Sequence, residues 1–92
     1  MKLGTVVKQP GETLSYTIDY SEALTVGDNI ASAFAQVSPV GMAVNNVSPV
    51  DPRVRFWASG GTTGITYKVT VTAHTADGRV FEDELVFKIK EM

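Results

Sequence analysis

The chain has 92 residues, of which 43% are hydrophobic and 20% charged, with no cysteine and a formal net charge of −2. This length fits one small domain with a single core, and we expect residues 1–92 to form it. The lack of cysteine excludes disulfides, thiol catalysis and thiolate metal sites. The small negative charge argues against nucleic acid as the main partner, because phosphate binding needs clustered lysine and arginine.

The N-terminus, Met1-Lys2-Leu3-Gly4-Thr5, lacks the apolar segment of a signal peptide. No apolar run in the chain approaches the length needed to cross a membrane. We therefore expect a complete reading frame that is used in the cell that makes it, with no membrane partner.

Strands dominate the predicted structure, because apolar and polar residues alternate with a period of two along much of the chain. Pro10-Gly11, Gly27-Asp28 and Asp77-Gly78 mark turns between strands. The sequence allows a single helical turn at residues 21–24, and its longest irregular stretch is residues 47–52. The strands are expected at residues 3–7, 14–20, 30–37, 42–46, 53–58, 65–75 and 80–90.

The best-defined element is the hairpin formed by the last two strands. A two-residue loop at Asp77-Gly78 would place carboxylates on its apolar face, whereas a three-residue loop keeps that face apolar. We therefore predict the longer loop, which pairs Val69 with Leu85 and requires a left-handed Gly78 in a bulged type I turn. Asp83, which falls on the apolar face, does not fit this pattern.

About seven short strands, separated by turns roughly every 8–12 residues, indicate an all-β, immunoglobulin- or fibronectin-III-like antiparallel sandwich. Tyr67 supports this fold because it follows the glycine-rich loop 60–64. A tyrosine corner would bond its hydroxyl back to that loop. We expect strand 14–20 in one sheet and the hairpin 65–90 in the other. The predicted core residues are Tyr16, Ile18, Val69, Val71, Leu85 and Phe87.

No residues are arranged for catalysis. His74, the only histidine, is expected on the polar face of a strand, with no serine or aspartate placed beside it. The acidic run 82–84 alternates between the two faces of a strand, so its carboxylates cannot converge on one substrate atom. It better fits a charged outer strand that discourages edge-to-edge pairing. We therefore predict no enzyme activity, no catalytic residues and no cofactor.

Two loop regions contain residue types that metal or phosphate sites use. Asp19, Glu22 and Asp28 fall near one end of the predicted sandwich, but no EF-hand loop is present to gather the oxygens that calcium needs. Loop 60–64 is rich in glycine, yet it lacks a following lysine and a helix to open. No metal or phosphate site is predicted.

Trp57 is the one residue that suggests a partner. In the strand at residues 53–58, alternate residues form an apolar face, which leaves Trp57 on the opposite face with Arg53 and Arg55. Two interpretations stay open: Trp57 is exposed beside an arginine, or it folds over the strand end and caps the core. Because tryptophan and arginine are enriched at interface hot spots, we predict Trp57 and Arg55 as partner-binding residues.

Several short segments combine turns and strand starts in a distinctive order over most of the chain. The first, Lys8–Tyr20, has the form Lys-x-Pro-x-Glu-x-Leu followed by Tyr-x-Ile-Asp-aromatic. The others are Gly27–Ile30, Pro39–Met42, Ser59–Val71 and Asp77–Arg79. Together these segments resemble the small tailed-phage and prophage proteins described as fibre–tail adaptors.

The resemblance implies a non-enzymatic structural protein of the virion, present in several copies around the tail or its fibres. Its partners would be other tail or fibre proteins, and it would be synthesised in the cytoplasm of the host bacterium. The residues alone leave an alternative open, a free-standing immunoglobulin-like module that binds carbohydrate or a cell surface. That function needs aromatic residues facing solvent, and only Trp57 clearly qualifies.

Overall fold

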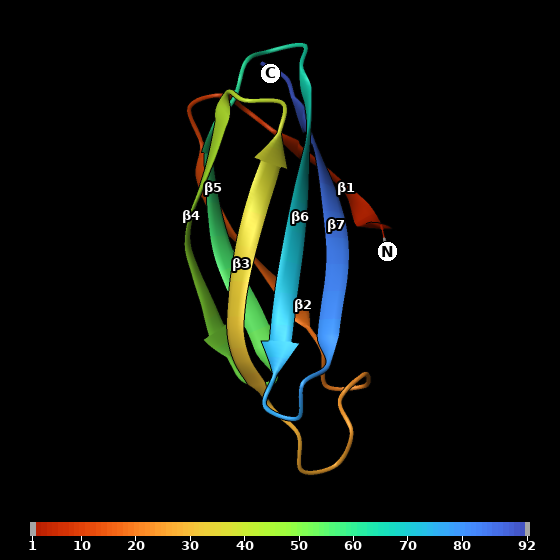
Figure 1. Cartoon of the computed structure of the whole chain (residues 1–92). Coiled ribbons are helices and arrows are strands. Elements are labelled where there is room, and N and C mark those ends of the chain that lie inside the picture. Colours follow the sequence, from red (N-terminus) through yellow and green to blue (C-terminus); the bar gives the residue numbers. More distant parts are fainter. Residues whose placement is uncertain (1, 92) are drawn as a thin grey trace.

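The computed structural model describes residues 2–91, which form seven strands and no helix (Figure 1). Two sheets pack face to face, with strand orders β1-β7-β6-β3 and β2-β5-β4. The architecture confirms the predicted seven-stranded, all-β sandwich. The strands are β1 (Lys2–Lys8), β2 (Thr13–Asp19), β3 (Ile30–Ser38), β4 (Met42–Val50), β5 (Arg53–Gly60), β6 (Thr66–Thr75) and β7 (Val80–Ile89).

The sheet assignment of the strands agrees with the sequence, apart from the pairing of β1. Strand β2 lies in one sheet and the β6–β7 hairpin in the other, as predicted. Strand β1 runs parallel to β7, with Val6 opposite Phe87, so the antiparallel prediction is wrong for this pair. In a constant-type immunoglobulin domain the first strand joins the opposite sheet. Here β1 instead covers the edge of β7.

Strand β4 is longer than predicted and extends to Val50. A shift in pairing between Asn45 and Ser48 marks a bulge, in which Asn46 has a φ of 52°. A bulge inserts an extra residue and interrupts the alternation of side chains, so the sequence pattern stops before the strand does. Pro49 is tolerated because β4 is an edge strand.

The longest connection between strands is the loop between β2 and β3, and not residues 47–52 as the sequence indicated. Where the sequence allows a single helical turn it contains a hydrogen-bonded turn, in which the N–H groups of Ala23 and Leu24 donate to the Tyr20 carbonyl at 2.9 and 3.1 Å. The loop ends where the Ile30 N–H donates to the Asp51 carboxylate at 2.7 Å. This bond fixes the start of β3 against the β4–β5 turn.

The β6–β7 hairpin has the predicted register, with Val69 opposite Leu85 and Tyr67 opposite Phe87. Gly78 has a φ of 97°, which confirms the left-handed conformation required by the three-residue loop. The parity of the apolar residues was therefore sufficient to select the turn.

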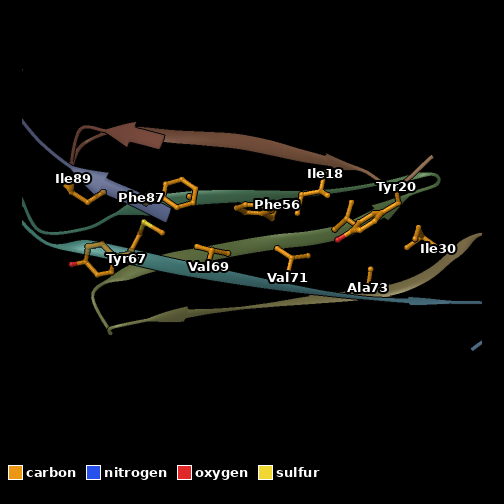
Figure 2. Packing of buried hydrophobic residues seen from close by; sticks show 13 residues of the cluster. Ile18, Tyr20, Ile30, Phe56, Tyr67, Val69, Val71, Ala73, Phe87 and Ile89 are labelled. Carbon is orange, nitrogen blue, oxygen red and sulfur yellow. The ribbon is translucent and has the colours of Figure 1, made fainter. Parts of the chain in front are cut away.

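The core lies between the two sheets, where side chains from β2 and β5 meet those of β6 and β7 (Figure 2). Of the predicted core residues, Ile18, Val69, Val71 and Phe87 are buried. Tyr16 and Leu85 are partly buried and pack against the cluster. The Tyr16 ring meets the Phe87 ring edge-on, with their centroids 5.0 Å apart.

Asp83 is buried on the inner face opposite Val71, and the nearby Tyr20 accounts for its position. The Tyr20 ring stacks on Phe81, which also belongs to β7, with centroids 5.3 Å apart. Burial raises the pKa of Tyr20, and the Asp83 carboxylate raises it further. The tyrosine hydroxyl makes no well-formed hydrogen bond within residues 2–91. The acidic residue that did not fit the pattern thus lies beside a phenol, at the margin of the core.

Candidate functional site

Three turns, 8–13, 38–42 and 60–66, meet at one end of the sandwich, the upper end in Figure 1. The side chain of Lys8 is fully buried there, and its Nζ donates to the carbonyls of Gln9 and Gly60 at 2.8 and 2.6 Å. Burial lowers the pKa of Lys8, and the charge of Glu12 partly opposes this effect. The Glu12 carboxylate accepts the Gln9 N–H at 2.8 Å. Lys8 therefore links β1 to the end of β5.

Tyr67 forms the predicted tyrosine corner at the same end. Its hydroxyl accepts the Thr62 N–H at 3.0 Å. Gly41 has a φ of 139°, and a Cβ added there would lie 2.7 Å from the tyrosine oxygen. The N–H of Gly61, which has a φ of 101°, donates to the Gly41 carbonyl at 3.1 Å. The two glycines thus allow two turns to close over the tyrosine.

Turns 19–30, 50–53 and 75–80 lie at the opposite, lower end (Figure 1), where the carboxylate of Asp28 joins the first of them to the third. This carboxylate is shielded from solvent and accepts the N–H groups of Asn29 and Asp77 at 2.9 and 3.0 Å. It also pairs with Nη1 of Arg79 at 2.9 Å. Burial alone would raise the pKa of Asp28. Hydrogen bonds from Thr75, the two N–H groups and Arg79 outweigh that effect and hold the pKa below its usual value.

The segments that carried the family resemblance are assembled at these two ends. Residues 8–12, 39–42 and 59–67 build the upper end, and residues 27–30 and 77–79 build the lower end. Their lysine, tyrosine, aspartate and arginine side chains are used in contacts within the chain. These side chains therefore hold the two ends together, and a surface for a partner has to be sought away from the ends.

The residues considered for metal binding or catalysis do not converge on one another. No group of three or more metal-ligating side chains occurs within residues 2–91. Asp19 pairs with Arg53 at 3.6 Å, while Asp28 is engaged with Arg79. His74 is half-buried on the outer face of β6, where its ring stacks on Phe34 with centroids 6.0 Å apart.

Trp57 and Arg55 lie on the outer face of β5, the central strand of the three-stranded sheet. Trp57 is half-buried and sits between Ser15 of β2 and Asn45 of β4, whereas Arg55 is exposed. Trp57 is not part of the core, so of the two alternatives the outer-face position is the one observed. We call this surface the Trp57 face. Its members, by strand register, are Thr13, Ser15, Thr17, Ala43, Asn45, Ser48, Arg55, Trp57 and Ser59.

One protein family matches nearly the whole chain. The family model described as "Podophage GP4 fiber-tail adaptor protein gp77" matches residues 8–88. The chain belongs to this family. Its members are structural proteins of the phage tail, so this chain is a tail component of the virion. No curated protein gives a significant match.

Membership in the fiber-tail adaptor family agrees with the resemblance found in the sequence. The sequence did not predict two contacts at the ends of the sandwich. The burial of Lys8 and the Asp28–Arg79 pair depend on partners 52 and 51 residues away. Their only local signal is a charged residue next to a turn. Within the described part of the chain, no helix is long and apolar enough to cross a membrane.

Proposed function

We propose that this protein acts without catalysis as an adaptor between the tail and its fibres, and that it binds its neighbours through the Trp57 face. The observation that carries this proposal is an aromatic ring and a guanidinium group, two residues apart on one flat sheet surface. Both belong to a central strand that is paired on both sides. Such a surface is already rigid, so little conformational entropy is lost when a partner binds.

The neighbours of Trp57 are suited to contact with another protein. Ser15, Thr17, Ala43 and Asn45 have short side chains, so a partner can reach the indole ring without displacing them. Arg55, which is exposed, can donate to a carboxylate or carbonyl on the partner. Tryptophan and arginine are both enriched at interface hot spots.

The number of copies in the particle determines how high the affinity of each binding site must be. A tail is a symmetric assembly, and an adaptor around it is expected in several copies. Each contact then needs only moderate affinity, because linked sites bind with high effective concentration. The partners we propose are tail and fibre proteins, without nucleic acid or membrane.

The proposal includes that this protein is not an enzyme. Within residues 2–91, the side chains considered for catalysis do not include a nucleophile held beside a base and an orienting group. His74 stacks on Phe34, and the charged residues at the lower end are hydrogen-bonded to one another. A sugar-binding module is less well supported, because Tyr16 and Tyr20 pack on the inner side and leave Trp57 as the aromatic residue of its face.

The proposal is tested by binding and incorporation measurements with purified tail and fibre proteins from the same genome. Trp57→Ala should weaken binding on the order of tenfold or more, as expected for a hot-spot residue. Arg55→Ala should have a smaller effect. Lys68→Ala is the matched control, because it removes an exposed cation from the outer face of the other sheet.

Circular dichroism and thermal unfolding of each variant establish that it is folded. If folded Trp57→Ala enters particles as well as wild type, the Trp57 face is not the interface. If the wild-type protein binds neither tail nor fibre proteins and is absent from particles, the adaptor function itself is rejected.

A further inference from the structure

One lateral side of the sandwich carries no charge. All eight lysine and arginine residues, all ten aspartate and glutamate residues and the single histidine lie outside residues 30–50. This segment forms β3 and β4, the edge strands of the two sheets, which pack next to each other (Figure 1). Charged residues are depleted in the cores of protein interfaces, so an uncharged side in a chain with this many charges indicates a contact surface.

Strand β3 is the least protected edge of the molecule. Within residues 2–91 it pairs with β6 on one side and with no strand on the other. Edge strands usually carry charges, prolines or bulges that prevent pairing with another chain. Strand β4 has a bulge and Pro49, β1 has lysines at both ends, and β2 ends on Asp19. From Ser32 to Ser38, β3 pairs regularly with β6 and has none of these features.

The fold can accept another strand at this edge. Strand β3 is the outer member of the β7-β6-β3 part of its sheet. Variable-type immunoglobulin domains extend the corresponding sheet with further strands beside the same strand. An extended segment can therefore be added next to β3 without rearranging the sandwich.

The side chains of β3 are nearly symmetric about Phe34. An antiparallel copy of the strand, related by a two-fold axis at Phe34, would place Ser32 opposite Gln36 and Ala33 opposite Ala35. Phe34 would lie opposite itself. The Phe34 side chain is 49% exposed on the outer face, and pairing would remove it from water in both copies. Because the strand is uncharged, two copies can approach without repulsion.

We propose that β3 pairs antiparallel with β3 of a second copy of this chain, so that two four-stranded sheets join across a two-fold axis at Phe34. The contact is isologous, as in most symmetric dimers. It uses a different surface from the Trp57 face and does not depend on the proposed adaptor function.

Single cysteines test the register directly, because the chain has none of its own. Phe34→Cys should give a disulfide-linked dimer under mild oxidation, since directly opposed strand residues lie within the Cα separation that a disulfide requires. Ser32→Cys alone should form about tenfold less dimer, because its copies are not opposed. A mixture of Ser32→Cys and Gln36→Cys proteins should restore cross-linking. Equal cross-linking of all single variants, or none with Phe34→Cys, overturns the proposal.

Sedimentation of the cysteine-free protein at high concentration provides an independent measurement. Wild type should show a concentration-dependent dimer, and Phe34→Lys should be monomeric because a lysine on an edge strand blocks pairing. Thr72→Lys is the matched control, since Thr72 lies opposite Phe34 on the neighbouring inner strand β6. A monomeric wild type, or equal loss of the dimer in both variants, shows that another partner or no partner covers β3.

Discussion

The two ends of the sandwich differ in the chemistry that holds their turns together. At the upper end, Lys8 and Tyr67 bond to backbone groups of neighbouring turns, and Gly41 and Gly61 allow those turns to approach closely. At the lower end, one carboxylate, Asp28, accepts bonds from two turns and an arginine. The upper end therefore depends on steric fit and on bonds to backbone groups, whereas the lower end depends on an ionised carboxylate that joins two turns.

This difference predicts different responses to mutation and to pH. A larger side chain should be harder to accommodate at the upper end, where two glycines contact buried groups. Acid should affect the lower end first, because the Asp28 carboxylate there joins two turns, whereas the Glu12 carboxylate at the upper end bonds only within its own turn. Both sheets share one core, so a change at either end should appear in the stability of the whole sandwich.

The largest effect is expected from Gly41→Val. The new Cβ would lie 2.7 Å from the Tyr67 hydroxyl, and the backbone has a φ of 139°. Strain and overpacking together should destabilise the protein by about 3 kcal/mol or more. Gly78→Val at the lower end is the comparison, because its φ of 97° is also left-handed but nothing lies within 4 Å of the added Cβ. Denaturant unfolding should therefore show a smaller loss for Gly78→Val, of about 1–2 kcal/mol. Equal losses would contradict the steric account of the upper end.

The next effect concerns Lys8. Lys8→Met keeps the unbranched stem of the side chain but removes both Nζ bonds to carbonyls, and should destabilise the protein by about 2 kcal/mol at neutral pH. The lowered pKa of Lys8 also predicts the direction in which stability changes with pH. Between its folded pKa and its ordinary value, the unfolded chain binds more protons than the folded one, so wild-type stability gains a contribution that rises with pH. Urea titrations between neutral and alkaline pH should show this contribution in wild type and not in Lys8→Met.

Tyr67→Phe should have a smaller effect of about 1 kcal/mol, because it leaves the ring in place and removes only the hydroxyl that accepts the Thr62 N–H. Hydrogen exchange of the Thr62 amide provides a local measurement and should accelerate in the variant. If unfolding stability and the Thr62 amide are both unchanged, water replaces the hydroxyl and the corner contributes little.

The sequence predicted what depends on near neighbours in the chain. Alternation located the strands and, through the parity of Val69 and Leu85, the register of the hairpin. It could not predict that β1 would pair parallel with β7, because either sheet offers an edge to a short strand. The alternation also predicted too early an end for β4, since the bulge at Asn46 breaks the period of two.

The candidate site was predicted in part. The face of Trp57 followed from the alternation in residues 53–58, whereas its neighbours Ser15 and Asn45 come from strands that only the sheet order brings together. Partner binding by Trp57 and Arg55, and a single domain over residues 1–92, stay predictions. The Lys8–Gly60 and Asp28–Arg79 contacts link residues more than fifty positions apart, and no local pattern specifies them.

The last prediction separates the two ends by acid. Asp28→Asn keeps an oxygen that can accept the N–H groups of Asn29 and Asp77, but it loses the charge that pairs with Arg79. Because Arg79 is partly exposed, we expect only a modest loss of stability at neutral pH. The pKa of Asp28 is lowered in the folded protein. Its stabilising contribution is therefore complete above the ordinary aspartate pKa and is lost as the pH falls through the folded value.

Wild type and Asp28→Asn should consequently converge in stability as the pH is lowered from neutral to below the ordinary aspartate range. The measurement is urea unfolding across that range, with Asp77→Asn as the control. Asp77 also contacts Arg79, at 3.3 Å, but its side chain is 57% exposed and it should change the pH dependence much less. Amide exchange in the loop 19–30 should accelerate in acid before exchange in the loop 60–66. If both loops open together, the two ends are a single unit and their different chemistry has no effect on where unfolding begins.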